Sequence, residues 1–414
     1  MNKEIFVYAG WTEEKPELIG VLYSFVIRGR ETFSFEYENE WLESGVGAGS
    51  MILDPDIQAF RGRQYLPGDK SIFGIFADSS PDRWGRLLMK RREAIYAAEE
   101  KRIPSRLTES DYLLGVYDDA RMGGFRFSIE KGGAFLSDDD KLSIPPWVDL
   151  RKLEAIAMHI ESNDDHLEKE WIDQLIAPGS SLGGARPKAT IRDDKGELWI
   201  AKFPSKLDDY NIGAWEMVVH DLAKMCGLNV PEAKLISFTK NRGTFIVKRF
   251  DRKNNKRVHF ASAMTMLGKT DMDNNAGYID IAGFLKAHSV EPSKDLEELW
   301  KRMVFNMAVS NSDDHLRNHG FVLTKKGWIL SPAYDINPVP YGNDLSLQIV
   351  PGDFRIDKET AIDSAHYYGL EYKKAKEMME EIISTVRNNW ERLSGKYSID
   401  RQSMEYMKPA FMKL

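Results

Sequence analysis

The hydrophobic pattern changes along this chain of 414 residues, and the change restricts the folds that it can adopt. From Ile5 to Tyr37 the apolar residues form short runs rich in β-branched and aromatic side chains, interrupted by Gly, Pro and charged residues. Such runs are typical of an antiparallel β meander. From about Ala282 onward the pattern is mostly helical, with one hairpin over 321–330. The sequence therefore predicts an α+β fold in which a β-rich part precedes a mostly helical part.

The region between these two parts alternates between helices and strands. A helix is expected to begin at Ser79-Ser80-Pro81-Asp82, with Ser80 as its cap and Pro81 in the first helical position, and to continue to Ala98. The other expected elements are helices over 150–160, 167–176 and 212–225 and strands over 189–192, 198–203, 234–238 and 244–250. Acidic residues followed by Ile144-Pro145-Pro146 predict a linker. We therefore expect three segments, over 1–145, 146–252 and 253–414.

The charge and cysteine content argue against several classes of protein. With 57 Lys and Arg against 64 Asp and Glu, the net charge is −7, which does not suit a chain whose overall field attracts nucleic acid or an anionic membrane. The lone cysteine, Cys226, excludes an internal disulfide and fits a reducing compartment. No stretch approaches the ~20 apolar residues of a membrane span, and none resembles a signal peptide. We expect a cytoplasmic protein that does not enter a membrane.

A glycine-rich segment, Gly179-Ser180-Ser181-Leu182-Gly183-Gly184-Ala185-Arg186-Pro187-Lys188, lies just before a predicted strand. Adjacent glycines allow backbone N–H groups to approach an anion closely, and Lys188 adds a positive charge. The same composition is common in ordinary flexible loops. Alone, the segment is therefore a weak indication of a phosphate-binding loop.

Two polar segments of the second half carry the residues of a candidate catalytic centre. In Asn311-Ser312-Asp313-Asp314-His315-Leu316-Arg317-Asn318, an Asp and an Asn five positions apart suit phosphoryl transfer, with Asp313 taking the proton of the acceptor hydroxyl and Asn318 holding magnesium. In Tyr334-Asp335-Ile336-Asn337-Pro338, Asp335 follows a predicted strand and suits a metal between phosphates, although such a turn is also a common helix cap.

The order of these parts is that of a two-lobed kinase. A glycine loop precedes a strand that carries Lys202, a helix follows with an inward-capable Glu216, and a strand leads into a short hinge before the Asp313 loop, the hairpin and Asp335. The eukaryotic G-x-G-x-x-G loop is absent, and Tyr334-Asp335-Ile336-Asn337 stands where such kinases carry D-F-G. His315 and His319 lie four apart, but the glutamate of a zinc helix is missing.

The sequence resembles the HipA-type serine/threonine kinases of bacterial toxin–antitoxin systems. The motifs that carry the resemblance extend over 73–86, 181–188, 200–204, 247–252, 311–318 and 334–335. It implies that Asp313 is the catalytic aspartate, that Asn318 and Asp335 bind magnesium, and that Lys202 contacts the ATP phosphates. The other implied ATP-binding residues are Gly183, Gly184, Ala185, Arg186, Pro187, Lys188, Lys248, Arg249, Phe250 and His315. Ser181 would be the autophosphorylated residue that inactivates the enzyme, with Ser180 as the alternative.

The resemblance also implies a fold and a set of partners. Residues 1–145 would form an extra β-rich subdomain, 146–252 the remainder of the N-terminal lobe with glycine loop and hinge, and 253–414 a helical C-terminal lobe. ATP and Mg²⁺ would be the cofactors, and a small helix-turn-helix antitoxin the partner through which DNA is reached. An aminoacyl-tRNA synthetase is the protein substrate that the family suggests. The alternatives are a catalytically silent nucleotide-binding co-repressor and, in last place, a small-molecule or lipid kinase.

Overall fold

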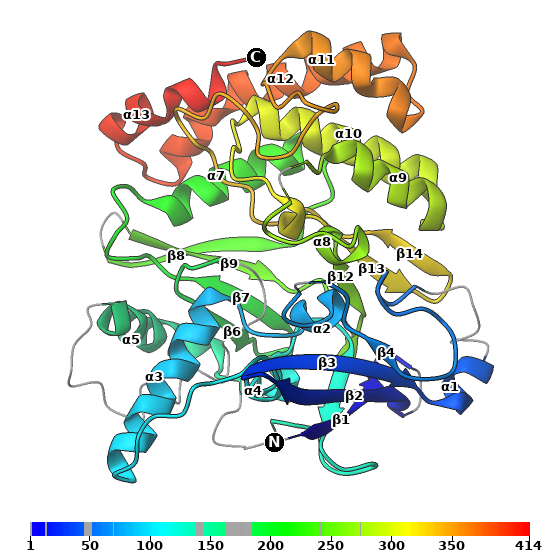
Figure 1. Cartoon of the computed structure of the whole chain (residues 1–414). Helices are drawn as coiled ribbons and strands as arrows, with labels where there is room; N and C mark the ends of the chain where they lie inside the picture. The colour runs from blue at the N-terminus through cyan, green and yellow to red at the C-terminus, as the bar shows by residue number, and fades with distance from the viewer. Residues whose placement is uncertain are drawn as a thin grey trace. The chain divides into compact units, whose positions relative to one another are not determined.

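The computed structural model describes residues 2–12, 15–44, 52–68, 70–137, 144–161, 175, 184–239, 242–273 and 275–414. The chain divides into two compact units (Figure 1). The first contains Met1–Ala201 and Asp251–Ala261, and the second contains Lys202–Phe250 and Ser262–Leu414. These two units have other limits than the three segments expected from the sequence, whose boundaries are at residues 145 and 252. A division into two units does not test a division into three segments, which stays a prediction.

A five-stranded sheet forms the centre of the first unit, with the strand order β4-β3-β2-β1-β5. Its strands are β1 (Lys3–Ala9), β2 (Glu17–Ile27), β3 (Arg30–Tyr37), β4 (Gln64–Tyr65) and β5 (Phe125–Ser128). Neighbouring strands pair antiparallel, and the pairs β1–β2 and β2–β3 confirm the meander expected over residues 5–37. Alternate residues of β1, such as Ile5 and Val7, are completely buried, which places one face of the sheet in the core.

The other elements of the first unit are mainly short. They are α1 (Asn39–Glu43), α2 (Gly74–Ala77), α3 (Arg83–Glu99), α4 (Glu109–Leu114), α5 (Leu150–Glu161), β6 (Lys188–Arg192), β10 (Arg252–Lys253) and β11 (Lys256–Arg257). Strand β7 (Leu198–Lys202) ends on the first residue of the second unit. The helix expected over 167–176 lies outside the described residues, apart from Leu175.

Helix α3 begins at Arg83, two residues after the expected start at Pro81. Its cap is Asp82, whose Oδ1 accepts the Gly85 N–H at 2.8 Å, and the expectation that Ser80 caps the helix is wrong. The physical reason is that the Ser80 hydroxyl already donates to the Phe76 carbonyl oxygen at 2.9 Å, within the turn that ends α2. Asp82 also supplies the negative charge favoured at a helix N-terminus.

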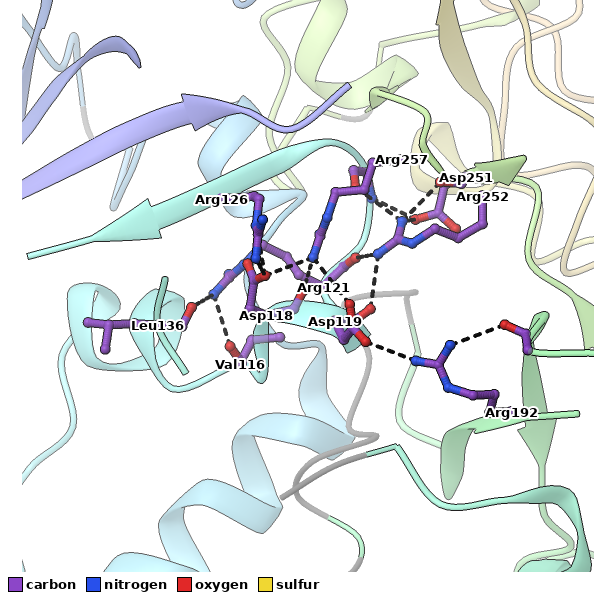
Figure 2. A network of polar contacts seen from close by, with 12 residues as sticks. Val116, Asp118, Asp119, Arg121, Arg126, Leu136, Arg192, Asp251, Arg252 and Arg257 are labelled. Atoms are coloured by element: carbon purple, nitrogen blue, oxygen red, sulfur yellow. Dashed lines mark hydrogen bonds and ion pairs between the residues drawn. The ribbon is translucent and has the colours of Figure 1, made fainter. Parts of the chain in front are cut away.

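A buried guanidinium joins distant parts of the first unit. The Arg121 side chain is fully buried and donates to the carbonyl oxygens of Val116 and Leu136, at 3.0 and 3.3 Å (Figure 2). It also donates to those of Ser79 and Leu113, at 2.9 and 2.8 Å. Burial lowers the pKa of Arg121 to about 9, so the group remains charged at neutral pH. Its hydrogen bonds replace those that the guanidinium loses when it leaves water.

A second set of ion pairs explains why residues 251–261 belong to the first unit. Arg257 Nη2 and Arg126 Nε both donate to Asp118 Oδ2, at 2.9 and 2.8 Å (Figure 2). Arg252 pairs with Asp251 at 2.7 Å and also donates to the Asp119 carbonyl oxygen at 3.0 Å. Charged groups therefore help to attach this short segment, together with the buried His259 ring, which stacks 4.3 Å from the ring of Trp11.

The second unit is mostly helical. Its helices are α7 (Ile212–Met225), α8 (Ala263–Met266), α9 (Tyr278–His288), α10 (Pro292–Ala308), α11 (Lys358–Asp363), α12 (Tyr372–Lys396) and α13 (Arg401–Phe411). Two antiparallel hairpins accompany them, β8 (Ala233–Thr239) with β9 (Arg242–Lys248) and β13 (Gly320–Thr324) with β14 (Gly327–Leu330). Strand β12 (Phe260–Ser262) crosses the limit between the units.

Helix α7 and the hairpin over 321–330 confirm the corresponding sequence predictions. The apolar stripe of α7 includes Trp215, Val218 and Leu222, all of which are buried. The helix packs against β9 and α12, while α10 packs against α9 and α12 (Figure 1). These contacts set the positions of α7 and α10, from which the candidate site is built.

The described part of the chain contains no helix that is both long enough and apolar enough to cross a membrane.

We predict that a buried carboxyl group makes the stability of the first unit depend on pH. Asp54 is 1% exposed, and its two oxygens accept the N–H groups of Asp56 and Ile75, both at 2.8 Å. Burial raises the pKa of Asp54 to about 6. An unfolded Asp titrates near pH ~4, so the folded state binds this proton more tightly than the unfolded state does. This difference stabilises the folded state by on the order of 1–3 kcal/mol below about pH 4. The stabilisation is lost as the pH rises through about 6.

Urea unfolding of the wild type and of Asp54→Asn at several values between pH 4 and 7 measures this effect. The variant should lack this component of the pH dependence, although it loses acceptor capacity and is less stable throughout. The exposed substitution Asp194→Asn is the control and should keep the wild-type slope. Equal slopes for Asp54→Asn and the wild type would contradict the assignment.

Candidate active site

Three charged side chains from distant parts of the chain meet inside the second unit. Lys202, the last residue of β7, donates from Nζ to Glu216 Oε1 at 2.5 Å and to Asp335 Oδ1 at 2.7 Å. These partners lie 14 and 133 residues further along the chain. Glu216 is on α7 and is only 4% exposed, and its ion pair with Lys202 offsets part of the cost of burying its charge. Lys202 and Asp335, predicted as site residues, are thus brought together.

The charge of Lys202 is maintained by these two carboxylates. Burial alone would lower the pKa of the ammonium group, but the charges of Asp335 and Glu216 act in the opposite direction, and the pKa lies above its ordinary value. Lys202 therefore carries a full positive charge at neutral pH. A fixed cation of this kind is suited to an anionic ligand such as a phosphate group.

The backbone around Asp335 is held in an unusual conformation. Asp335 has φ +58°, in the left-handed region, which Asp and Asn adopt more readily than most residues. Asn337 Nδ2 donates to Asp335 Oδ1 at 3.2 Å, and the Ala333 N–H donates to the Asn229 carbonyl oxygen at 2.8 Å. The carboxylate thus has its place set by contacts on both sides of it.

The Asp313 loop follows the end of α10. Its central residue, Asp313, is exposed, whereas Asn318 is buried at the end of a 3₁₀ turn and donates from Nδ2 to the Asp313 carbonyl oxygen at 3.1 Å. Desolvation raises the pKa of the Asp313 carboxyl group, and the charges of Asp335 and Asp314 add to this increase while His315 opposes it. The two loops are also in direct contact, since the Tyr334 hydroxyl donates to the Arg317 carbonyl oxygen at 2.7 Å.

The oxygen donors at this place fit magnesium better than zinc. The described residues contain no group of three or more His, Cys, Asp and Glu side chains that could hold a metal. They do offer Asp335 and Asn337, which contact each other, and Asn337 Oδ1 is buried without a hydrogen-bond partner among the described residues. Asn318 follows Arg317, whose carbonyl oxygen accepts from the Tyr334 hydroxyl. Magnesium prefers a few oxygen ligands and retains several waters, so a set of carboxylate and amide oxygens suits it.

The predicted hinge residues lie next to the Asp335 loop. Lys248 ends β9, and its N–H donates to the Glu232 carbonyl oxygen at 2.8 Å. Arg249 is buried, and the Phe250 ring lies 5.6 Å from the ring of Tyr334, the residue before Asp335. The second unit therefore brings residues 248–250 close to the same loop.

The glycine-rich segment belongs to the first unit and is described only in part. Ser180, Ser181 and Gly183 lie outside the described residues. Gly184 has φ +97°, which a side chain would strain, and Lys188 forms a buried ion pair with Asp82 at 2.8 Å. The phosphate-binding role of residues 183–188 stays a prediction, because these residues and Lys202 fall in different units.

Three asparagines near the site, Asn337, Asn306 and Asn311, have no role predicted from the sequence. Asn337 was visible as a polar residue two positions after Asp335, and Asn311 opens the Asp313 loop. Asn306 carries no such signal, since it lies within the apolar helix α10. Only the folded chain shows that its amide is buried beside the loop.

Comparison with known proteins identifies a family. The family model described as the HipA-like C-terminal domain matches residues 180–390, or 211 of the 414 residues. A Haemophilus influenzae protein named as a kinase is 32% identical over 187 residues, which are 39% of this chain and 54% of that protein. The serine/threonine-protein kinase toxin HipA of Shewanella oneidensis is 26% identical over 222 residues, 47% of this chain and 50% of the toxin.

The chain thus spans about half the length of the curated relatives that it matches. Among solved structures, the Shewanella oneidensis toxin–antitoxin system HipA, HipB and operator DNA complex contains a chain with a TM-score of 0.66 and 16% identity. That match covers 98% of this chain and 95% of the other. It confirms the expected α+β, two-lobed kinase-like fold.

We predict that Lys202 contributes strongly to the stability of the second unit. In Lys202→Met, the stem is preserved but the buried Glu216 carboxylate loses its ion pair with Lys202, and breaking such a pair costs about 3–5 kcal/mol. Urea unfolding of this variant and of Lys376→Met, at an exposed position of α12, gives the comparison. The control should stay within about 0.5 kcal/mol of the wild type. A similarly small effect of Lys202→Met would show that the buried ion pair is not formed.

Proposed function

We propose that this chain, which belongs to the family with a HipA-like C-terminal domain, is an ATP- and magnesium-dependent serine/threonine protein kinase of the HipA toxin type. The observation that supports the proposal is the position of Lys202, which contacts both Glu216 and Asp335, together with the hydrogen bond from the Asn337 N–H to Asn311 Oδ1 that joins the two loops. A fixed cation, a proton acceptor and oxygen donors for a metal are the parts that phosphoryl transfer requires.

Each residue has a defined task in the proposed reaction. Lys202 binds the phosphate oxygens of ATP, and Asp313 aligns the acceptor hydroxyl and takes its proton as the oxygen attacks the γ-phosphorus and ADP leaves. Asn318 and Asp335 would hold magnesium, with Asn337 as a further oxygen donor. Magnesium, when bound, neutralises the negative charge of the phosphates. Positioning and electrostatic stabilisation thus supply most of the rate.

Two further groups of residues would complete the nucleotide-binding site. The backbone of Lys248, Arg249 and Phe250 would contact the adenine, and residues 183–188 and His315 would contact the phosphates. Autophosphorylation of Ser181, or of Ser180, would expel the glycine loop and inactivate the enzyme. Both serines lie outside the described residues, so this step rests on the family resemblance.

The partners follow from the same resemblance. One relative is named as a toxin, and the matched solved structure contains HipB and operator DNA. We propose that a small helix-turn-helix antitoxin binds this chain, and that the chain reaches DNA only through it. The protein substrate is proposed to be an aminoacyl-tRNA synthetase, and the site of action the cytoplasm.

We predict that Asp313→Asn abolishes phosphoryl transfer while nucleotide affinity is retained. The amide cannot accept the hydroxyl proton, and loss of a general base costs about 10²–10⁴-fold in rate. The measurement is transfer from labelled ATP with Mg²⁺, together with mass spectrometry of the peptide that contains Ser180 and Ser181. Asp209→Asn, an exposed position of the same unit, should keep wild-type activity.

This experiment also separates the kinase from the co-repressor alternative. A wild-type chain that binds ATP and Mg²⁺ but labels neither its own serines nor a protein in a lysate of its host would favour the nucleotide-binding module. Near-normal transfer by Asp313→Asn would show that another group takes the proton.

A further inference from the structure

A buried carboxylate stands directly beside the exposed Asp313. Asp314 is 2% exposed and accepts hydrogen bonds from three side chains. Tyr278 Oη and Asn306 Nδ2 both donate to its Oδ2, the second at 3.0 Å. His319 Nε2 lies 3.0 Å from both carboxylate oxygens and must be the protonated nitrogen, because a carboxylate only accepts. These four residues are called the Asp314 cluster below.

The Asp314 cluster encloses the candidate metal-binding part of the loop. Asp314 and His319 lie at either end of a segment that contains His315 and Asn318, and their contact closes this segment into a ring. Within it, the Asn318 N–H donates to the His315 carbonyl oxygen at 2.8 Å. Tyr278 opens α9 and Asn306 lies in α10, so two packed helices hold the ring from outside.

A chain of three asparagines continues from the cluster to the second loop of the site. Asn311 Nδ2 donates to Asn306 Oδ1 at 3.2 Å, and the Asn337 N–H donates to Asn311 Oδ1 at 3.4 Å. Asn337 Nδ2 then donates to Asp335 Oδ1 at 3.2 Å. Hydrogen bonds thus extend without interruption from Asp314 to Asp335, buried at the Asp314 end and partly buried at Asn337, and their members belong entirely to the second unit.

We infer that Asp314 is a positioning residue, which fixes Asn318 through His319 and fixes Asp335 through the chain Asn306, Asn311 and Asn337. The inference rests on the proposed function, since it assigns these contacts to the metal ligands of the kinase. Residues that hold the ligands of a metal are needed for its affinity because they restrict the ligands to the productive orientation. Further links between the two loops agree with this: the Val339 N–H donates to the Ser310 carbonyl oxygen at 3.1 Å, and Ser346 Oγ to that of Ser312 at 2.5 Å.

The substitution Asp314→Asn tests the inference with little change in volume. It replaces one acceptor oxygen by an NH₂ group that faces the donors Tyr278, Asn306 or His319, so the cluster must rearrange. The matched control is Asp295→Asn. Asp295 is also a buried carboxylate of the second unit and accepts bonds from Ser289 Oγ and the Leu330 N–H, but it contacts no residue of the candidate site in the described structure.

Three measurements are made on each full-length chain. Binding of Mn²⁺ in the presence of ADP, followed by the electron paramagnetic resonance signal of free Mn²⁺, reports the metal site without any reaction. The kcat and KM of phosphoryl transfer report catalysis, and Tm reports stability. We expect Asp314→Asn to weaken Mn²⁺ binding and to lower kcat about 10–100-fold each, with little change in the KM of the acceptor. Asp295→Asn should lower Tm and leave Mn²⁺ binding and kcat unchanged.

A second variant keeps the test decisive if Asp314→Asn does not fold. Asn311→Ala leaves the Asp314 cluster intact but interrupts the asparagine chain, and it should also weaken Mn²⁺ binding. The inference is overturned if the variants that fold bind Mn²⁺ as the control does. If the wild type binds Mn²⁺ and the variants are weakened, but no chain transfers phosphate, then the proposed function fails while the positioning role of Asp314 is supported.

Discussion

A largely buried ammonium group, that of Lys202, imposes the main constraint on the second unit. Transfer of the Lys202 charge out of water is costly, and the cost is offset because Glu216 and Asp335 contact the same nitrogen. Because this charge must be compensated, three segments of the chain have to lie close together. They are the end of β7, helix α7 and the loop after β14. Helix α7 is itself held by packing against β9 and α12. Apolar packing therefore holds the charged groups in place. The contacts of Lys202 with Glu216 and Asp335 are lost if any one of the three segments moves away.

Two adjacent carboxylates in the same loop differ in exposure, and this difference suits them to different roles. Asp313 is exposed, whereas Asp314 is buried among donors from α9, α10 and the end of the loop. An exposed carboxylate can meet a reacting hydroxyl, and a buried one with three donors can hold backbone in place. The distinction follows from the direction in which each side chain leaves the loop.

In the first unit, buried charges are compensated by a different set of groups. The Arg121 guanidinium donates to four backbone carbonyl oxygens, and the Asp118 carboxylate accepts hydrogen bonds from the guanidinium groups of Arg126 and Arg257. Carbonyl groups at the ends of short elements lack partners in their own element, so one planar cation can satisfy several of them. This arrangement attaches residues 251–261 to a unit from which they are separated in sequence by Lys202–Phe250.

The sequence alone determined the α+β character, the meander over 5–37 and helix α7, because hydrophobic periodicity is a local property of the chain. It also predicted Lys202 and Asp335 as residues of one site, and the structure brings these two side chains into contact. It placed the start of α3 wrongly, since the choice between Ser80 and Asp82 as the cap depends on the carbonyl of Phe76. Tertiary structure alone decided which aspartate of Asp313-Asp314 is buried, and that Asn306 and Asn311 connect the two loops. Hydrogen bonds between residues on different elements leave no periodic trace in a sequence, and they form only after packing brings those elements together.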